Sequence, residues 1–190
     1  MPKAATWTMT MDKTLSLILG GARSGKSAHA QKLAHERGGD DVLFVATAQA
    51  RDDEMQTRIE AHRCDRPATW RTLEAPRHTG EAIAQAESSA VVLVDCLTLL
   101  VSNAVLALPE SASALEGESA ALAEVDELIG AYRRGTASWI VISNEVGLGL
   151  VPPYPVGRTY RDALGRANQR LAAEADEVLL MVAGIPIRIK

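Results

Sequence analysis

Gly20-Gly21-Ala22-Arg23-Ser24-Gly25-Lys26-Ser27 is the stretch that decides the fold, because it has the spacing of a phosphate-binding loop. The glycines let the backbone wrap closely round an oligophosphate, so that successive N–H groups and a helix N-terminus point at the anion. Lys26 then reaches the terminal phosphates, and Ser27 supplies a hydroxyl for Mg²⁺. A glycine turn entering a helix is the simpler alternative. Since the apolar run Leu15 to Leu19 precedes the loop and an alanine-rich segment follows it, the sequence favours a nucleotide site.

A carboxylate closes another apolar run further along the chain. Asp95 follows Val91-Val92-Leu93-Val94, which places it at the carboxyl edge of a predicted strand, where ligands of open α/β sheets bind. We expect it to hold Mg²⁺ through water, together with Ser27. It also suits the N-cap of a helix beginning near Cys96, and the two roles are compatible.

Apolar runs of strand length alternate with helical stretches. The runs are continuous, as in strands covered on both faces of a mainly parallel sheet: Leu15 to Leu19, Val42 to Ala46, Ala90 to Val94, Trp139 to Ser143 and Val178 to Val182. The helical stretches are Ser27 to Glu36, Asp52 to His62, His78 to Glu87, Glu118 to Arg134 and Tyr160 to Glu174. This pattern predicts an α/β fold of the P-loop NTPase (RecA-like) type, a three-layer sandwich round a mainly parallel central sheet.

The sequence also predicts the structure of three segments that lie outside these strands and helices. Residues 107–118 combine Pro109, Gly117 and several serines, which predicts a mobile loop. Residues 151–155 contain three prolines and predict an extended connection. Residues 184–190 predict a short terminal hairpin arm, in which Pro186 favours an edge position.

Length and composition limit the functional classes. The chain of 190 residues, 47% hydrophobic and 23% charged, fits one catalytic domain over residues 14–190, with residues 1–13 as a disordered extension. A net charge of −4 argues against nucleic acid as a partner. Two cysteines are too few for a disulfide framework, and no stretch approaches the eighteen apolar residues of a membrane span. We therefore expect a cytoplasmic protein that acts on a small molecule.

A family resemblance becomes visible beyond the phosphate loop. It is carried by six stretches of sequence: Ala46-Thr47-Ala48-Gln49, residues 52–63, residues 66–74, Val94-Asp95-Cys96-Leu97-Thr98, residues 143–152 and residues 158–176. Together they resemble the bifunctional adenosylcobinamide kinase / adenosylcobinamide-phosphate guanylyltransferase family of cobalamin biosynthesis. The resemblance covers essentially everything after residue 14.

The resemblance implies two reactions at one nucleotide site. ATP or GTP phosphorylates the hydroxyl of the aminopropanol arm of adenosylcobinamide, and GTP then gives its GMP to that phosphate, releasing pyrophosphate. It also implies a homotrimer, which no feature of the sequence itself indicates.

In this family a histidine carries the guanylyl group, and His62 is the matching residue. Neutral imidazole is a nucleophile near pH 7, and its phosphoramidate adduct is reactive enough to pass GMP onward. From spacing alone, a histidine near a helix end is more simply a surface residue interacting with the helix dipole. We assign that surface role to His29, His35 and His78.

The resemblance further implies a set of nucleotide contacts. Besides the phosphate loop, they are Thr47, Ala48, Gln49, Arg63, Cys64, Asp65, Arg66, Glu74 and Asp95. The arginines suit phosphate, and Glu74 can accept hydrogen bonds from ribose hydroxyls or a guanine edge. A solvent-exposed position is the alternative for Glu74. Some family members carry Glu at the position of Asp95, and either carboxylate serves the metal.

Two further groups of polar residues have more than one interpretation. Asn144 and Glu145 follow a predicted strand, so they either face the substrate or make ordinary turn and cap contacts. The last predicted helix carries the polar residues Arg161, Arg166, Asn168 and Arg170. These residues either line a subunit contact or a substrate groove, or they form a solvated face of the helix.

Two rival functions stay open from the sequence. The first is a simple P-loop kinase that uses Lys26, Ser27 and Asp95 and gives His62 no covalent role. The second is a nucleotide-gated switch, which the absence of an Asn-Lys-x-Asp motif argues against. Because that guanine-binding motif is absent, guanine preference rests on the resemblance alone.

Overall fold

The computed structural model describes residues 13–49 and 66–190. Its strands are β1 (Leu15–Gly20), β2 (Val42–Ala46), β3 (Arg71–Glu74), β4 (Val91–Asp95), β5 (Ser138–Ile142), β6 (Glu177–Val182) and β7 (Ile185–Arg188). Its helices are α1 (Lys26–Gly38), α3 (Thr79–Gln85), α4 (Leu97–Leu106), α5 (Ala114–Arg134) and α6 (Pro155–Glu174). Lys13, the last residue of the predicted disordered extension, is part of the folded domain, because its ammonium donates to the Gly135 carbonyl at 2.8 Å.

The described strands form one seven-stranded sheet in the order β3-β2-β4-β5-β1-β6-β7. Neighbouring strands run parallel except for the β6–β7 pair at one edge, which is antiparallel. Strand β5 separates β1, which leads into the phosphate loop, from β4, which ends at Asp95. The three-layer α/β sandwich with a mainly parallel sheet is confirmed.

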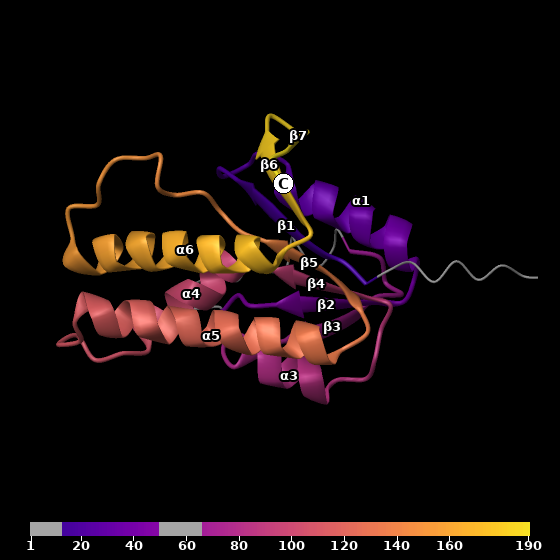
Figure 1. Cartoon of the computed structure of the whole chain (residues 1–190), viewed down its shortest axis with the longest axis horizontal. Coiled ribbons are helices and arrows are strands. Elements are labelled where there is room, and N and C mark those ends of the chain that lie inside the picture. Colours follow the sequence, from indigo (N-terminus) through magenta and orange to yellow (C-terminus); the bar gives the residue numbers. More distant parts are fainter. Residues whose placement is uncertain (1–12, 50–65) are drawn as a thin grey trace, which may run out of the picture.

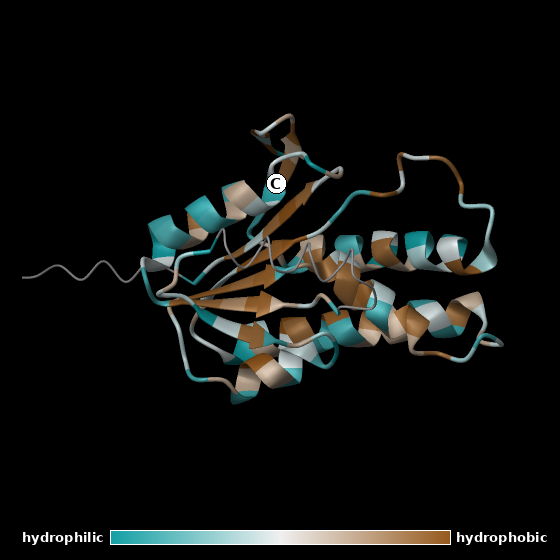
Figure 2. Ribbon diagram, turned by 180° about the vertical axis from the view of Figure 1, so that it is seen from behind, coloured by the Kyte–Doolittle hydropathy of each residue, from teal (hydrophilic) through white to brown (hydrophobic). Residues whose placement is uncertain are grey.

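Alternate residues of strands β1, β2, β4, β5 and β6 pack into two separate cores. On one face, Ile18, Leu93 and Ile140 pack against Ala30 and Ala34 of α1. On the other face, the intervening strand residues pack against α3, α4, α5 and α6. Figure 1 shows α1 alone on its side of the sheet, and Figure 2 shows the strands as the most hydrophobic part of the molecule. Burial on both faces explains why these strands are continuous apolar runs.

The sequence prediction missed strand β3, gave α4 only as a helix that begins near Cys96, and misplaced the starts of α5 and α6. Strand β3 alternates between half-buried and exposed residues at the sheet edge, so it lacks a continuous apolar run. The mobile loop predicted for residues 107–118 is wrong over its second half, because α5 begins at Ala114. Ser113 and Glu116 form a reciprocal capping box there. Helix α6 begins at Pro155, since proline suits the first helical turn.

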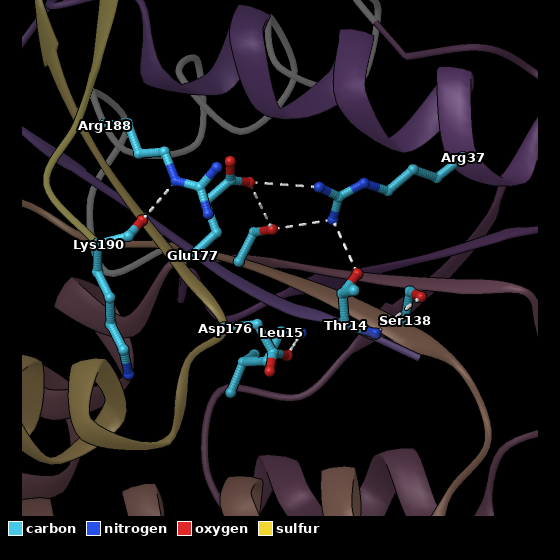
Figure 3. A network of polar contacts seen from close by, with 9 residues as sticks. Thr14, Leu15, Arg37, Ser138, Asp176, Glu177, Arg188 and Lys190 are labelled. Carbon is cyan, nitrogen blue, oxygen red and sulfur yellow. Dashed lines mark hydrogen bonds and ion pairs between the residues drawn. The ribbon is translucent and has the colours of Figure 1, made fainter. Parts of the chain in front are cut away.

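A polar network fixes the far end of α1 to the sheet (Figure 3). Arg37 of α1 donates to the Ser16 hydroxyl at 2.9 Å and to the Thr14 hydroxyl at 3.3 Å. Its second nitrogen pairs with the Glu177 carboxylate of β6 at 3.3 Å. Ser16 is fully buried, so these bonds satisfy a hydroxyl that water cannot reach. The helix that follows the phosphate loop is therefore anchored to β1 and β6.

The terminal hairpin arm predicted for residues 184–190 is confirmed as β7, an edge strand that contains Pro186. Its turn contacts the phosphate loop, because the Gly184 N–H donates to the Ser24 carbonyl at 2.9 Å. Among the described residues, no helix combines the length and apolar character that crossing a membrane requires.

Candidate nucleotide site

The phosphate loop lies between β1 and α1, as the sequence predicts. Gly20 and Gly25 have φ angles of 152° and 93°, values that side-chain-bearing residues rarely adopt. A Cβ on Gly20 would lie 2.6 Å from the Met181 carbonyl oxygen, and one on Gly25 would lie 3.0 Å from the Gly184 Cα. The two glycines are therefore required both by backbone conformation and by the close approach of the β6–β7 hairpin.

Lys26 is the first residue of α1 and is only 8% exposed. Its ammonium donates to the Gly21 carbonyl at 2.5 Å, so it lies over the loop that it follows. Burial lowers the pKa of Lys26, while Cys96 and Asp95 act in the opposite direction. A desolvated ammonium beside a ring of backbone N–H groups favours a bound phosphate.

Asp95 ends β4 at the same carboxyl edge, within electrostatic range of Lys26. The peptide bond between Asp95 and Cys96 is cis. Burial and the Asp95 carboxylate raise the pKa of the Cys96 thiol to about 11, so the thiol is neutral at pH 7. Burial raises the pKa of Tyr160 on α6 to about 12, and Cys96 adds to the shift. Asp95 thus lies close enough to both Lys26 and Cys96 to influence the pKa of each.

Thr47 fixes the backbone next to Asp95. It is fully buried, and its hydroxyl donates to the Cys96 carbonyl at 2.7 Å and accepts from the Cys96 N–H at 2.8 Å. Its own N–H donates to the Asp95 carbonyl at 3.2 Å. Asn103 of α4 donates to the Thr47 carbonyl at 2.8 Å. This positioning role is one that the sequence did not suggest, and the predicted nucleotide contact of Thr47 stays a prediction.

Other predicted contacts surround the same edge. Ala48 and Gln49 follow β2 and are half-buried, and Glu74 ends β3 level with Ala46, in an exposed position. The Arg66 guanidinium lies 3.5 Å from the centroid of the Phe44 ring. Because Phe44 belongs to the core beneath α1, Arg66 lies on the same face of the sheet as the phosphate loop.

Part of the predicted site lies outside the described residues. This part comprises the proposed nucleophile His62 and the neighbouring predicted contacts Arg63, Cys64 and Asp65. Of the other histidines, His35 and His78 are exposed and His29 is half-buried.

The predicted magnesium ligands are Ser27, the second residue of α1, and Asp95. Within residues 13–49 and 66–190, no group of three or more His, Cys, Asp or Glu side chains could form a metal centre. A hydroxyl and one carboxylate suit Mg²⁺ bound with a nucleotide, because that ion keeps several waters and takes few protein ligands. The residues present therefore fit the ion.

Helix α6 contributes a buried amide that the sequence did not identify as buried. Asn168 is 6% exposed, accepts from the Ser143 hydroxyl at 2.7 Å and donates to the Asn144 carbonyl at 3.1 Å. A solvated face is thus wrong for this residue. In contrast, Arg166 and Arg170 are exposed and pair with carboxylates of α5, Glu118 and Asp126. The spacing of small apolar residues around Asn168 on α6 was the available signal of its burial.

These features define a P-loop nucleotide-binding protein. A solved structure with a similar fold is the flagellar accessory protein FlaH from Methanocaldococcus jannaschii, with a TM-score of 0.52 and 14% sequence identity. The similarity covers 93% of this chain and 78% of that one, and it supports the fold alone.

The family follows from comparisons over nearly the whole sequence. Residues 16–189 match the family model described as cobinamide kinase / cobinamide phosphate guanyltransferase. The chain is 44% identical over 180 residues to the bifunctional adenosylcobalamin biosynthesis protein CobU of Salmonella typhimurium, covering 92% of this chain and 98% of that protein. It is 46% identical over 176 residues to the bifunctional adenosylcobalamin biosynthesis protein CobP of Pseudomonas aeruginosa, covering 92% and 96%. The chain belongs to this family of bifunctional transferases, and the resemblance is confirmed.

Proposed function

We propose that this chain catalyses two successive transfers at one nucleotide site. It first phosphorylates adenosylcobinamide with ATP or GTP, and it then transfers GMP from GTP to adenosylcobinamide phosphate. The products are adenosylcobinamide-GDP and pyrophosphate. The observation that carries this proposal is the family match over residues 16–189. In this chain the phosphate loop, Lys26 and Asp95 also lie together at one edge of the sheet.

In the first transfer, the alcohol oxygen of the aminopropanol arm attacks the γ-phosphorus of the nucleotide and releases its proton to water. The bond between that phosphorus and the β–γ bridging oxygen breaks, and the nucleoside diphosphate leaves. The loop N–H groups and the N-terminus of α1 hold the phosphates, while Lys26 balances the charge that develops on the leaving oxygen. Catalysis by these residues is therefore positioning plus electrostatic stabilisation.

Mg²⁺ is part of the proposal, with Ser27 and Asp95 as its protein ligands. When bound, the ion neutralises charge on the phosphate oxygens during transfer. The role of the chain is to present one hydroxyl from the phosphate loop and one carboxylate from the end of β4. We expect Asp95→Asn to raise the magnesium concentration at which both transfers reach half of their maximal rate.

In the second transfer, an imidazole nitrogen of His62 attacks the α-phosphorus of GTP and pyrophosphate leaves. A phosphate oxygen of adenosylcobinamide phosphate then attacks the same phosphorus, and the bond to His62 breaks. In the sequence, His62 comes between Gln49, which follows β2, and Arg66, which lies over the Phe44 ring. The family membership supports this assignment.

Labelling with GTP that carries a radioactive α-phosphate tests the proposal. The wild-type protein should retain an acid-labile label, whereas a simple kinase would leave it unmarked. His62→Ala should abolish the label and guanylyl transfer but leave phosphorylation of adenosylcobinamide. His35→Ala, which changes an exposed histidine on α1, is the matched control and should behave as wild type. Full guanylyl transfer by His62→Ala would refute the histidine intermediate.

The proposal extends to the state of the protein in the cell. We expect a cytoplasmic homotrimer, which sedimentation equilibrium and cell fractionation test. Adenosylcobinamide should raise the melting temperature in the presence of a non-hydrolysable nucleotide, because ligands stabilise the state that they bind. A nucleotide-gated switch would not respond to the corrinoid.

A further inference from the structure

Asn144 lies between the phosphate loop and Asp95. Strand β5 is placed between β1 and β4, and its last residue, Ile142, is level with Ile18 on β1 and with Asp95 on β4. Two residues further along, Asn144 is therefore level with Gly20, where the phosphate loop begins. The sequence left open whether Asn144 or Glu145 faces the substrate.

The hydrogen-bond ladder continues past the end of β5. The Ser143 N–H donates to the Ile18 carbonyl at 2.9 Å, and the Glu145 N–H donates to the Gly20 carbonyl at 3.1 Å. This two-residue repeat is the pattern of parallel strands, so side chains keep alternating between the two faces of the sheet through Glu145.

That alternation assigns a face to each side chain. Ile140 and Ile142 pack in the core beneath α1, while Ser143 bonds to Asn168 of α6 on the opposite face. Asn144 therefore returns to the α1 face and Glu145 to the α6 face. By the same alternation, Asp95 follows Val94 of the α6-side core and faces α1. Asn144 thus shares a face with Asp95 and with Lys26, the first residue of α1. Figure 1 shows helix α1 on that side of the sheet.

The backbone of Asn144 is held on every side. Its N–H donates to the buried Thr98 hydroxyl at 2.8 Å, and its carbonyl accepts from Asn168 at 3.1 Å. The flanking peptides are fixed to β1 by the ladder bonds to Ile18 and Gly20. A residue fixed in this way presents its side chain in one position, as preorganised catalytic groups require.

The two candidate side chains differ in what they bind. Among residues 13–49 and 66–190, the half-buried Asn144 carboxamide makes no hydrogen bond. The Glu145 carboxylate accepts from the Gly147 N–H at 2.7 Å, which is a local turn contact. An amide carries two donors and an acceptor, and in the half-buried Asn144 they remain available to a bound ligand.

We propose that Asn144 is a catalytic residue of the kinase reaction, whose carboxamide N–H donates a hydrogen bond to an oxygen of the γ-phosphoryl group. The inference rests on the proposed function. Lys26 and Asp95, which act on the terminal phosphate and its metal ion, lie on the same face, and this identifies the phosphate that Asn144 contacts. The bond strengthens as the phosphoryl group is transferred, so its loss lowers kcat more than it raises KM for the nucleotide.

The two half-reactions test this role separately. Phosphoryl transfer is measured with adenosylcobinamide and ATP, and guanylyl transfer with adenosylcobinamide phosphate and GTP. Asn144→Ala should lower kcat for phosphoryl transfer by about 100-fold or more, the usual effect of removing one preorganised donor. It should change KM for ATP by less than about 3-fold and guanylyl transfer by less than about 10-fold, because the second reaction occurs at the α-phosphorus. Asn144→Asp, which places a negative charge against the phosphate, should be slower still.

Glu145→Gln is the matched control, since it changes the neighbouring residue on the other face and keeps the oxygen that Gly147 binds. It should retain both activities. Preserved guanylyl transfer shows that Asn144→Ala is folded. Equal losses in both transfers, full phosphoryl transfer by Asn144→Ala, or an equal effect of Glu145→Gln would each overturn the role of Asn144. A wild-type protein that made neither product would overturn the proposed function, and the role of Asn144 with it.

Discussion

Replacing Thr47 by Val removes one hydroxyl and almost no volume, so it isolates the contribution of two hydrogen bonds. That hydroxyl donates to the Cys96 carbonyl at 2.7 Å and accepts from the Cys96 N–H at 2.8 Å. Thr47 is fully buried, so water cannot replace the hydroxyl. Both bonds hold the backbone of Cys96, the residue directly after Asp95.

The magnitude follows from what the Cys96 backbone loses. The Cys96 N–H is left without a partner, whereas the Cys96 carbonyl keeps its bond from the Leu100 N–H at 3.2 Å. An unpaired buried donor costs about 1–3 kcal/mol and the second lost hydrogen bond about 0.5–1.5 kcal/mol, together about 1.5–4.5 kcal/mol. We expect the lower part of this range, about 2–3 kcal/mol, because Cys96 is only partly buried and the Thr47 hydroxyl no longer has to be desolvated. For a domain of this size the melting temperature should fall by about 4–12 °C.

The assay is urea unfolding followed by circular dichroism, with Thr47→Ser as the control. Serine keeps the hydroxyl and loses one methyl group, which costs about 1 kcal/mol. Thr47→Val should therefore be the less stable variant, and its phosphoryl transfer should also fall because Asp95 is displaced. The reasoning is refuted if Thr47→Val is as stable as Thr47→Ser or more stable.

Three other predictions concern parts of the fold away from Thr47. Arg37→Gln should lower the free energy of unfolding by about 1–3 kcal/mol in urea titrations, because Glu177 loses its ion pair; an unchanged midpoint would contradict the network. Ser113→Ala should cost about 1 kcal/mol by removing the cap of α5, whereas Ser113→Asp should cost almost nothing; equal stabilities would argue against the capping box. In a Cys64→Ser background, the ultraviolet absorbance of the Cys96 thiolate should appear only near pH 11, because burial raises the pKa. In the folded state the Cys96 thiol keeps its proton up to a higher pH than in the unfolded state, in which its pKa is about 9. The stability that the protonated thiol contributes is therefore complete below pH 9 and is lost between about pH 9 and 11. A thiolate already formed at pH 8 would refute the buried thiol.

The fold could largely be predicted from the sequence because its main strands are buried on both faces. Short apolar runs rich in β-branched residues, such as Val91 to Val94, indicate buried strands. Strand β3 was missed since only alternate residues are half-buried and its pairing with β2 is a long-range interaction. The start of α5 was missed because serines and Gly117 resemble a loop, and Gly117 is in fact buried in the helix.

The candidate site, too, could be predicted from the sequence only in part. The phosphate loop and Asp95 could be located because a fixed spacing and a strand end define them. His62 depended on the family resemblance, and the described residues do not include it. The distinction between Asn144 and Glu145 needed the register of β5 against β1, which depends on contacts between residues more than a hundred positions apart. Such pairings leave no local signal in the sequence.

The position of β1 in the sheet also has a consequence for biogenesis. This strand emerges from the ribosome before β5 and β6, the strands with which it pairs in the described sheet, and the bond between Thr14 and Ser138 joins residues 124 positions apart. At roughly 5–20 residues per second, translation leaves the strand unpaired for several seconds or more. Met181 and Gly184, which pack against the loop glycines, emerge later still. Nascent chains halted before β6 should therefore fail to bind nucleotide, although they already contain every residue of the phosphate loop.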